Sequence, residues 1–330
     1  MKGLLVGYGS IGRRHLGNLH ALGVTDWAVV HTGRGTLPLE PPCPVRTYTD
    51  LDEALAAERP DFAVVANPTS LHVATARRCV DAGCSVLLEK PVSHDLVGVD
   101  DLRDAVAARG VGVAVAFQFR HHPALRHLRD LVNDRVLGAP LHAHLDWGEY
   151  LPDWHPWEDW RASHASRRDL GGGVLHVAHP LDYARMLFGD PVRVGGILSD
   201  LHPLGLDVPE AADVTLQFPD GPTVTSHVDY WRRTQMHTVV VTCTDGTITW
   251  DYMTGELRIR AAGASGWSTV PTPGVADRND LFVALARDFL GTVRSGTRPA
   301  CTLDDGIAVA HLADAVERSS ARGGVLVDLA

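Results

Sequence analysis

The chain is poor in the features that secreted, membrane-bound and nucleic-acid-binding proteins need. It has five cysteines among 330 residues, an odd number without a Cys-x-x-Cys pair, so we expect reduced thiols rather than a disulfide framework. No apolar run approaches the roughly 20 residues that span a bilayer, and a strand follows the N-terminus directly, which predicts a cytoplasmic protein without a signal peptide. The formal net charge is −10 and basic residues occur only in short runs, which argues against nucleic acid or a membrane surface as a partner.

What the chain does have is a glycine-rich turn at residues 7–12, with the sequence Gly-Tyr-Gly-Ser-Ile-Gly. An apolar run at residues 3–6 precedes it, and leucines at helical spacing follow it as far as Gly23, so it joins a predicted strand to a predicted helix. The first glycine permits a tight turn, the second admits a pyrophosphate to the main chain, and the third lets helix and strand pack closely. An ordinary glycine turn is the alternative. We predict a dinucleotide site that includes Gly7, Gly9, Ser10, Ile11 and Gly12.

The second predicted strand, residues 26–30, is followed by no acidic residue of the kind that usually holds the ribose hydroxyls of NAD. Thr32 and Arg34 stand there instead, and a guanidinium is suited to a 2′-phosphate. The sequence therefore favours NADP(H) over NAD(H), unless Arg34 is only a solvated loop residue.

Apolar strands alternate with helices through the first 118 residues, and further strands are expected at residues 61–66, 84–88 and 111–117. This alternation of strands and helices predicts right-handed β-α-β units and a parallel sheet. Such a sheet binds ligands at the carboxyl ends of its strands. Those ends carry Asn67, Pro68, His72, Glu89, Lys90 and Arg120. Lys90 precedes a proline, and its ammonium could polarise or protonate a substrate oxygen. A salt bridge with Glu89 or another carboxylate explains this lysine equally well.

The second half of the chain is rich in predicted strands, with Asp-Gly turns at residues 220–221 and 245–246 that are typical of an antiparallel sheet. Before them, residues 150–161 interleave prolines and tryptophans with Asp, His and Arg. Such a tract suits stacking against a sugar or polyol, or it is simply an aromatic cluster that packs under a loop.

Three glycines at residues 171–173 precede a predicted helix over residues 174–189. His176, His179 and Asp182 recur every three residues and would share one face of that helix. This spacing lacks the i,i+4 histidine pair of His-Glu-x-x-His zinc sites, so we expect no metal. Proton transfer is the other chemistry that such histidines perform.

Together these motifs resemble the Gfo/Idh/MocA oxidoreductases, the family of glucose–fructose oxidoreductase and inositol dehydrogenase. The resemblance covers nearly the whole chain and is marked by residues 7–15, 67–72, 89–91, 120–123 and 171–182. It implies an α/β protein with an N-terminal Rossmann domain (residues 1–118) and a C-terminal substrate-binding α/β domain (residues 119–330). In the family the open, mostly antiparallel sheet of the second domain often forms oligomers, so a homodimer or homotetramer is implied. The resemblance also implies that Lys90 lies near the nicotinamide and that His179 is the catalytic histidine.

The chain departs from the family at one point. Many members carry an acid three or four residues before the catalytic histidine, where this chain has Leu175 and His176. Either His176 substitutes for the acid, or Asp182 orients His179 instead.

We therefore predict an NAD(P)-dependent oxidoreductase that moves a hydride between nicotinamide and a hydroxyl or ketone carbon of a sugar, nucleotide sugar or cyclitol. Lys90 and His179 are the predicted catalytic residues. The candidate substrate contacts are Arg120, Trp154, His176, Asp182 and Tyr230. Two alternatives are a redox-neutral hydrolase or eliminase that retains its nicotinamide, and a nucleotide-binding regulator without catalysis.

Overall fold

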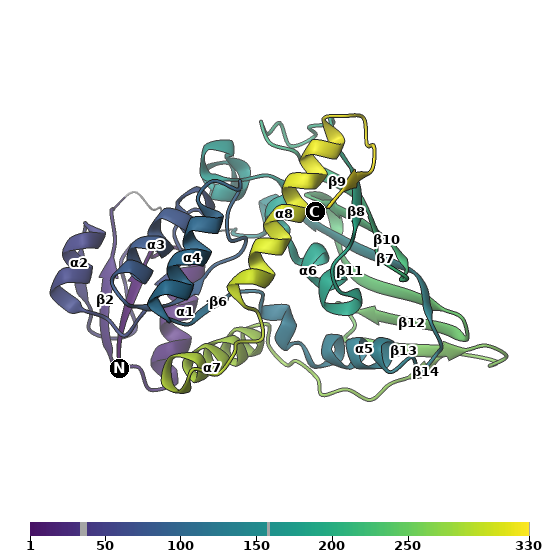
Figure 1. The fold of residues 1–330 in the computed structure, drawn as a ribbon, viewed down its shortest axis with the longest axis horizontal. Coiled ribbons are helices and arrows are strands. Elements are labelled where there is room, and N and C mark those ends of the chain that lie inside the picture. Colours follow the sequence, from purple (N-terminus) through teal and green to yellow (C-terminus); the bar gives the residue numbers. More distant parts are fainter. Residues whose placement is uncertain (34–37, 157–158, 330) are drawn as a thin grey trace. The chain divides into compact units, whose positions relative to one another are not determined.

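The computed structural model describes residues 1–33, 38–156 and 159–329, which form two compact units (Figure 1). The first unit consists of Met1–Gln118, Asp169–Gly171 and Asp277–Ala310, and the second holds the rest. A segment near the C-terminus thus belongs to the first unit, and the division into domains at residues 1–118 and 119–330 stays a prediction. The assignment of cofactor and substrate binding to the two parts stays a prediction.

The sheet of the first unit has six strands, all parallel, in the order β3-β2-β1-β4-β5-β6. The strands are β1 (Lys2–Val6), β2 (Asp26–Val30), β3 (Arg46–Tyr48), β4 (Phe62–Val65), β5 (Ser85–Leu88) and β6 (Val113–Val115). The predicted Rossmann-type parallel sheet is confirmed. Strand β3 is an addition to the prediction, because its sequence Arg-Thr-Tyr lies at the sheet edge and lacks an apolar run.

Helices connect strands of this sheet as β-α-β crossovers: α1 (Ser10–Ala21), α2 (Leu51–Glu58), α3 (His72–Asp81), which follows the short 3₁₀ segment η1 (Thr69–Leu71), and α4 (Val99–Arg109). Helix α7 (Asn279–Ser295) also belongs to this unit but comes from the C-terminal part of the chain. Helix α8 (Leu303–Ser320) contributes its residues up to Ala310 to this unit and the remainder to the second. Asp50 caps α2: its side chain accepts a hydrogen bond of 2.9 Å from the Glu53 N–H, which satisfies a donor that the helix leaves open.

One apolar core joins α1 and α7 to the same face of the parallel sheet. Phe62 of β4 is its centre, with its ring edge-to-face against Trp27 at 5.6 Å and against Phe289 of α7 at 5.5 Å. Fully burying such a ring stabilises a fold by about 1.5–3 kcal/mol, and α7 also buries Phe282 and Leu285 there. This burial is the physical reason why a C-terminal segment belongs to the N-terminal unit.

The sheet of the second unit has nine strands in the order β14-β13-β12-β11-β7-β10-β9-β8-β15. Only the β7–β10 pair is parallel, so the predicted, largely antiparallel sheet is confirmed, as are the two hairpins β9–β10 and β11–β12. The strands are β7 (Pro140–Tyr150), β8 (Arg193–Leu198), β9 (Ala211–Gln217), β10 (Thr223–Asp229), β11 (Trp231–Cys243), β12 (Gly246–Asp251), β13 (Glu256–Ala261), β14 (Ser268–Thr269) and β15 (Val327–Asp328).

Helix α5 (Pro123–Asn133) packs against β12 and β13 of this sheet, α6 (His179–Phe188) packs against β7 and β10, and the end of α8 hydrogen-bonds to β8 through Ser319 and Ser320. The remaining segments are short 3₁₀ turns: η2 (Gln118–His121), η3 (Leu151–Asp153), η4 (Trp160–Ala162), η5 (His164–Ser166), η6 (Arg168–Leu170) and η7 (Val174–Val177). In the part of the chain that the structure describes, no helix has the length and apolar content needed to cross a membrane.

The single helix expected over residues 174–189 is wrong, because the chain breaks inside it. A 3₁₀ turn, η7, ends at Val177, Ala178 adopts a left-handed conformation with φ of 57°, and α6 begins at His179. Pro180 explains the break, since it has no N–H to donate to the carbonyl of His176 and its ring would clash with that carbonyl. His176 and His179 therefore belong to different elements and do not share a helix face.

Candidate functional site

In the glycine turn a side chain would clash with backbone at Gly7 and Gly12, whereas at Gly9 there is space for one. A Cβ on Gly7, whose φ is 95°, would lie 2.6 Å from the backbone at Ala66 and Asn67, and one on Gly12 would lie 2.1 Å from the Gly7 carbonyl oxygen. Gly9, in contrast, has no atom within 4 Å of its Cβ position. It immediately precedes α1, whose first N–H groups lack partners within the helix. This turn therefore fits a pyrophosphate at Gly9 and the start of α1, at Ser10 and Ile11.

The predicted ribose-binding residues follow β2. Thr32 is exposed there, directly after His31, whose N–H donates to the Tyr48 carbonyl at 2.8 Å and so continues the sheet. Arg34 lies outside the described residues. The role of both predicted residues stays a prediction.

His72 ties the turn after β4 to the turn after β5. Its Nδ1 lies 2.8 Å from the Pro91 carbonyl oxygen and its Nε2 lies 2.9 Å from the Asn67 carbonyl oxygen. Burial lowers the pKa of His72, although the two carbonyls work in the opposite direction. The Asn67 side chain donates to Thr75 at 2.8 Å, while its Oδ1 is buried and has no hydrogen-bond partner among the residues described. That oxygen is available to a ligand donor, and Pro68 sets the start of η1 beside it.

Glu89 fixes the main chain at Lys90. Its Oε1 lies 2.7 Å from Nε2 of His15, and its Oε2 accepts the Lys90 N–H at 3.0 Å. Burial opposes ionisation of Glu89, but the hydrogen bond and charge of His15 and the charge of Lys90 outweigh it and lower the pKa of the carboxyl. Lys90 itself is half-buried, and the Lys90–Pro91 peptide bond is cis. His15 was not among the predicted site residues, although its position three residues after Gly12 was a visible signal.

In the second unit, Arg120 and Asp182 bind each other. The guanidinium of Arg120 reaches the Asp182 carboxylate through Nε and Nη2, with distances of 2.7–3.1 Å, and both side chains are buried. Two parallel donors make this a bidentate pair, and Asp182 lies in the first turn of α6, where the helix dipole favours an anion. The predicted substrate role of each residue stays a prediction.

His179 starts α6 inside an aromatic cluster. Its ring stacks on Trp147 at 4.9 Å with 21° between the planes, and the ring of Phe119 meets it edge-on at 5.0 Å. The side chain is 3% exposed, so bulk water has little access to it. Trp147 and Phe119 were absent from the prediction; the alternation of apolar residues along β7 was the available signal for Trp147.

His176 faces a second histidine. Its Nε2 lies 2.9 Å from Nε2 of His164, and the two ring centroids are 4.6 Å apart. At that distance one of these nitrogens carries a hydrogen and donates a hydrogen bond, which the other nitrogen accepts. His176, which stands where many family members have an acid, is thus hydrogen-bonded to a second imidazole. The sequence analysis did not predict a role for His164.

Tyr230 contacts both Trp154, which belongs to the aromatic tract of residues 150–161, and Gly173, which directly precedes η7. The Tyr230 hydroxyl donates to the Gly173 carbonyl oxygen at 2.7 Å, and complete burial raises the pKa of this phenol. Trp154 meets the Tyr230 ring edge-on at 5.5 Å. Residues 157–158 of the tract lie outside the described part of the chain.

The structure thus groups the predicted residues into two sets, one in each unit. Residues 7–12, 32, 67–72 and 89–90 lie in the first unit, and residues 120, 154, 176, 179, 182 and 230 lie in the second. Within the described ranges, no group of three or more His, Cys, Asp and Glu side chains is arranged to hold a metal ion.

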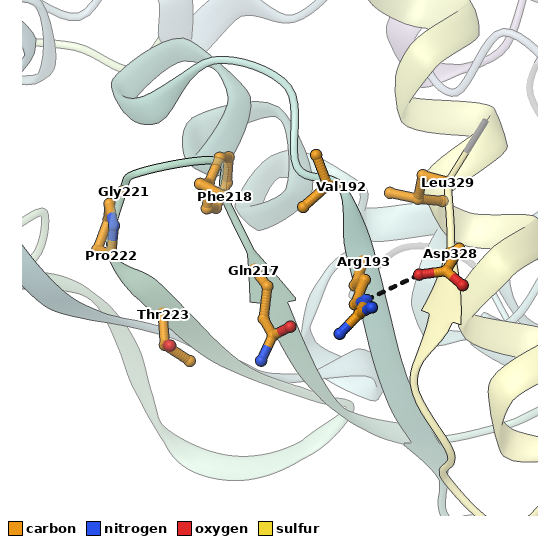
Figure 2. Close-up of a pocket in the computed structure, with 9 residues that line it drawn as sticks. All are labelled: Val192, Arg193, Gln217, Phe218, Gly221, Pro222, Thr223, Asp328 and Leu329. Carbon is orange, nitrogen blue, oxygen red and sulfur yellow. Dashed lines mark hydrogen bonds and ion pairs between the residues drawn. The ribbon is translucent and has the colours of Figure 1, made fainter.

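A separate hollow of about 530 Å³ lies at the ends of β8, β9, β10 and β15 (Figure 2). Arg193 and Asp328 form its visible ion pair, with 2.7 Å between Nε and Oδ1, and both side chains are more than half exposed. The other lining residues are Val192, Gln217, Phe218, Gly221, Pro222, Thr223 and Leu329. None of the predicted site residues lines it, so it is not part of the candidate site.

Two family models match the chain. One, described as "Oxidoreductase family, NAD-binding Rossmann fold", matches residues 1–117, and the other, the GFO/IDH/MocA C-terminal domain, matches residues 125–249. The chain belongs to the Gfo/Idh/MocA oxidoreductase family. The family resemblance inferred from the motifs is thereby confirmed.

Relatives within this family match over different lengths. The D-apiose dehydrogenase of Paraburkholderia graminis is 24% identical, over 99% of this chain and 89% of the relative. An uncharacterized oxidoreductase of Synechocystis is 31% identical over 46% of this chain, and the NADP(+)-dependent D-xylose 1-dehydrogenase of Haloarcula marismortui is 26% identical over 52%. This chain spans only 41% and 49% of the lengths of those two proteins.

Solved structures share the fold. A levoglucosan dehydrogenase in complex with NADH and L-sorbose superposes with a TM-score of 0.85 at 21% identity, and each chain is covered completely. The UDP-N-acetylglucosamine 3-dehydrogenase of Acidithiobacillus ferrooxidans superposes with a TM-score of 0.79 at 21% identity, over 97% of this chain and 98% of that one.

Proposed function

We propose that this protein is an NAD(P)-dependent oxidoreductase that transfers a hydride between nicotinamide and a hydroxyl or ketone carbon of a sugar, nucleotide sugar or cyclitol. The observation that carries the proposal is the glycine turn. Backbone atoms leave no space for a side chain at Gly7 and Gly12, whereas the space beside Gly9, at the start of α1, is free for a ligand. Membership of a family with an NAD-binding Rossmann model supports it, as do relatives named for sugars and a nucleotide sugar.

The first unit supplies the residues that would hold the cofactor. The open N–H groups at Gly9, Ser10 and Ile11 bind the pyrophosphate, and the unpartnered Asn67 oxygen accepts a hydrogen bond from the bound nucleotide. When bound, the nicotinamide donates or accepts the hydride. The buried contacts of His72 and Glu89 keep the main chain beside Lys90 in one conformation, and such rigidity is what a positioned catalytic group needs.

The proposed catalytic residues are Lys90 and His179. In the oxidising direction a ring nitrogen of His179 takes the hydroxyl proton while the carbon gives up its hydride, and the proton returns in the reducing direction. The Lys90 ammonium donates a hydrogen bond to a substrate oxygen and stabilises the negative charge that develops on it. The aromatic rings around His179 keep water away from that histidine, which strengthens its interaction with the substrate.

Other second-unit residues shape the substrate site. Trp154 offers an apolar face to a sugar ring, and His176, coupled to His164, provides the polar group at the place of the expected acid. The other proposed substrate contacts are Arg120, Asp182 and Tyr230. Hydrogen bonds hold these side chains in place, between Arg120 and Asp182 and from Tyr230 to the Gly173 carbonyl oxygen.

Cofactor preference and assembly complete the proposal. The lack of an acid after β2 and the presence of Thr32 and Arg34 favour NADP(H) over NAD(H), and a relative that uses NADP(+) supports this preference. We further propose that the nine-stranded sheet forms a homodimer or homotetramer, and that the enzyme works in the cytoplasm.

A screen of polyols tests the proposal. The purified protein is mixed with NADP⁺ or NAD⁺ and with sugars, sugar phosphates, nucleotide sugars and inositols, and formation of reduced nicotinamide is followed by absorbance. At least one compound should be oxidised by wild type, and Lys90→Met should bind the cofactor yet turn over at least 100-fold more slowly. A protein that binds no nicotinamide nucleotide, or a Lys90→Met variant with full activity, would contradict the proposal.

A further inference from the structure

The imidazole of His179 is stacked against two aromatic rings. The indole of Trp147, on β7, lies nearly parallel to it, with 4.9 Å between the ring centroids and 21° between the planes. Tyr183, one turn further along α6, stacks on it at 6.2 Å and 24°. All three side chains are buried. The nearer of the two rings, Trp147, therefore presents its face to the imidazole.

Strand pairing and ring contacts hold Trp147 in place. Its register partner on β11 is His237, and the centroids of these two rings are 4.0 Å apart. Phe119 meets the indole edge-on at 5.5 Å. A rotation of the indole would break these contacts, so the ring face stays on His179.

The surroundings of His179 oppose a positive charge on its ring. The side chain is 3% exposed, so an imidazolium at this position loses most of its hydration. His179 is also the first residue of α6, and the dipole of a helix is positive at its N-terminus. Titratable or charged side chains adjoin the cluster, among them Arg120, His122, Asp182, Tyr183, His237 and Tyr252.

These neighbours add little net charge. Asp182 is bound by Arg120 through two donors, so the two charges largely cancel. Burial lowers the pKa of His122 to about 4, which makes this residue neutral near pH ~7. The π-electrons on the face of Trp147, in contrast, attract a cation without a carboxylate.

We propose that Trp147 stabilises the imidazolium form of His179 that arises when this histidine takes the hydroxyl proton of the substrate. Among aromatic side chains an indole attracts a cation on its face most strongly, within about 6 Å of the ring centroid, and the attraction is largest where water is excluded. The inference rests on the proposed function and deepens it. Trp147 acts through His179, so it is a positioning residue for the proposed reaction.

The contact favours the step because it changes with the charge of His179. In oxidation the substrate carbon gives up its hydride to the oxidised nicotinamide, and the O–H electron pair forms the carbonyl double bond. The proton becomes the second N–H of the His179 ring. The neutral imidazole gains less from the ring face than the cation does, so the contact lowers the barrier rather than only tightening binding.

Fluorinated tryptophans test the ring face without a change in packing. Each fluorine withdraws electron density from the face and leaves the shape of the indole nearly the same. Mono-, di- and trifluorotryptophan are incorporated specifically at position 147. Oxidation of the compound that wild type oxidises in the polyol screen is then followed at saturating NADP⁺ or NAD⁺. We expect kcat to fall stepwise, about 3-fold or more with three fluorines, while KM and the unfolding temperature stay nearly constant.

Trp250 of β12 supplies the matched control. Its ring is buried in the same cluster but contacts His122 at 5.0 Å and His237 at 4.9 Å. The same fluorinated series at position 250 should leave kcat unchanged. Trp147→Phe keeps a weaker ring face and Trp147→Leu removes it, so kcat should fall about 3-fold and about 10-fold. If either variant proves unstable, the fluorinated series remains decisive.

Two results would overturn the inference and leave the proposed function intact. One is a constant kcat across the fluorinated series at position 147, and the other is an equal fall at positions 147 and 250. In both cases wild type still oxidises its substrate and His179→Gln remains inactive. If wild type oxidises no compound in the screen, or His179→Gln keeps full activity, the proposed function fails and the inference fails with it.

Discussion

Nε2 of His15 lies 2.7 Å from Oε1 of Glu89, and both side chains are buried. The two residues are 74 positions apart, one on α1 and the other directly after β5. Through this contact the helix that starts at the glycine turn is joined to the main chain that carries Lys90. The helix that follows the glycine turn and the main-chain N–H of Lys90 are thus linked through the buried Glu89 carboxylate.

The first prediction concerns that link. Glu89→Gln keeps the shape but removes the charge that His15 and the Lys90 N–H share, so the position of Lys90 becomes less well fixed. We expect kcat to fall about 10-fold or more with a small change in the Kd of the cofactor. Steady-state kinetics on the substrate found by the screen measures both. A loss of cofactor binding with kcat unchanged would instead make Glu89 a binding residue.

The second prediction separates two glycines by what surrounds them. Gly9→Val should fold normally because no atom lies within 4 Å of its Cβ, yet it should weaken nucleotide binding by blocking close approach of the pyrophosphate. Gly12→Val should lower stability, since its Cβ would lie 2.1 Å from the Gly7 oxygen. Thermal unfolding and nucleotide titration of both variants make the comparison. Equal unfolding temperatures for the two variants would contradict it.

The third prediction concerns the Arg120–Asp182 pair. Removing either partner breaks a buried, bidentate ion pair, so Arg120→Met and Asp182→Asn should each destabilise the protein by about 3–5 kcal/mol. The double variant Arg120→Met/Asp182→Asn should lose less than the sum of the single losses, because it removes both charges of the pair together. Urea unfolding supplies all four free energies. Strictly additive losses would show that the pair is not coupled.

Local signals in the sequence were sufficient for much of the fold. The apolar run before residues 7–12 predicted β1, and the Asp-Gly turns predicted the hairpins β9–β10 and β11–β12, because each depends on residues close together in the chain. Pro180 was equally visible and should have ended the helix expected through Ala178. The histidine spacing fits one continuous helix, but the proline has no N–H for the helix ladder and decides where α6 begins.

Other features depend on contacts between distant residues and had no local signal. Asn18 and Asn279 exchange two hydrogen bonds of 2.9–3.0 Å across 261 positions, and this pairing belongs to the docking of α7 on α1. The His164–His176 pair and the stacking of Trp147 on His179 are of the same kind. The residue types were evident from the sequence, but which of them would meet was decided by the fold.

The last prediction is a dependence of stability on pH that originates at His227 of β10. Hydrogen bonds to Asp229 and then Asp213, with distances of 3.1 and 2.8 Å, raise the pKa of His227 to about 9 although burial opposes this. In the unfolded chain its pKa is ~6.5, so the folded state binds the proton more tightly. The stabilisation is complete below about pH 6.5 and disappears as the pH rises through about 9.

His227→Gln should therefore lower the unfolding free energy at pH ~6 by about 1 kcal/mol, a value that allows for partial exposure of the ring. At pH ~10 wild type and variant should have nearly the same stability, because His227 is then neutral in both states. His144→Gln on the neighbouring β7 is the matched control, since its ring lies 2.9 Å from the neutral Thr225 hydroxyl. Urea unfolding of the three proteins across this range measures the difference, and a gap between wild type and His227→Gln that widened with rising pH would contradict the ion-pair origin.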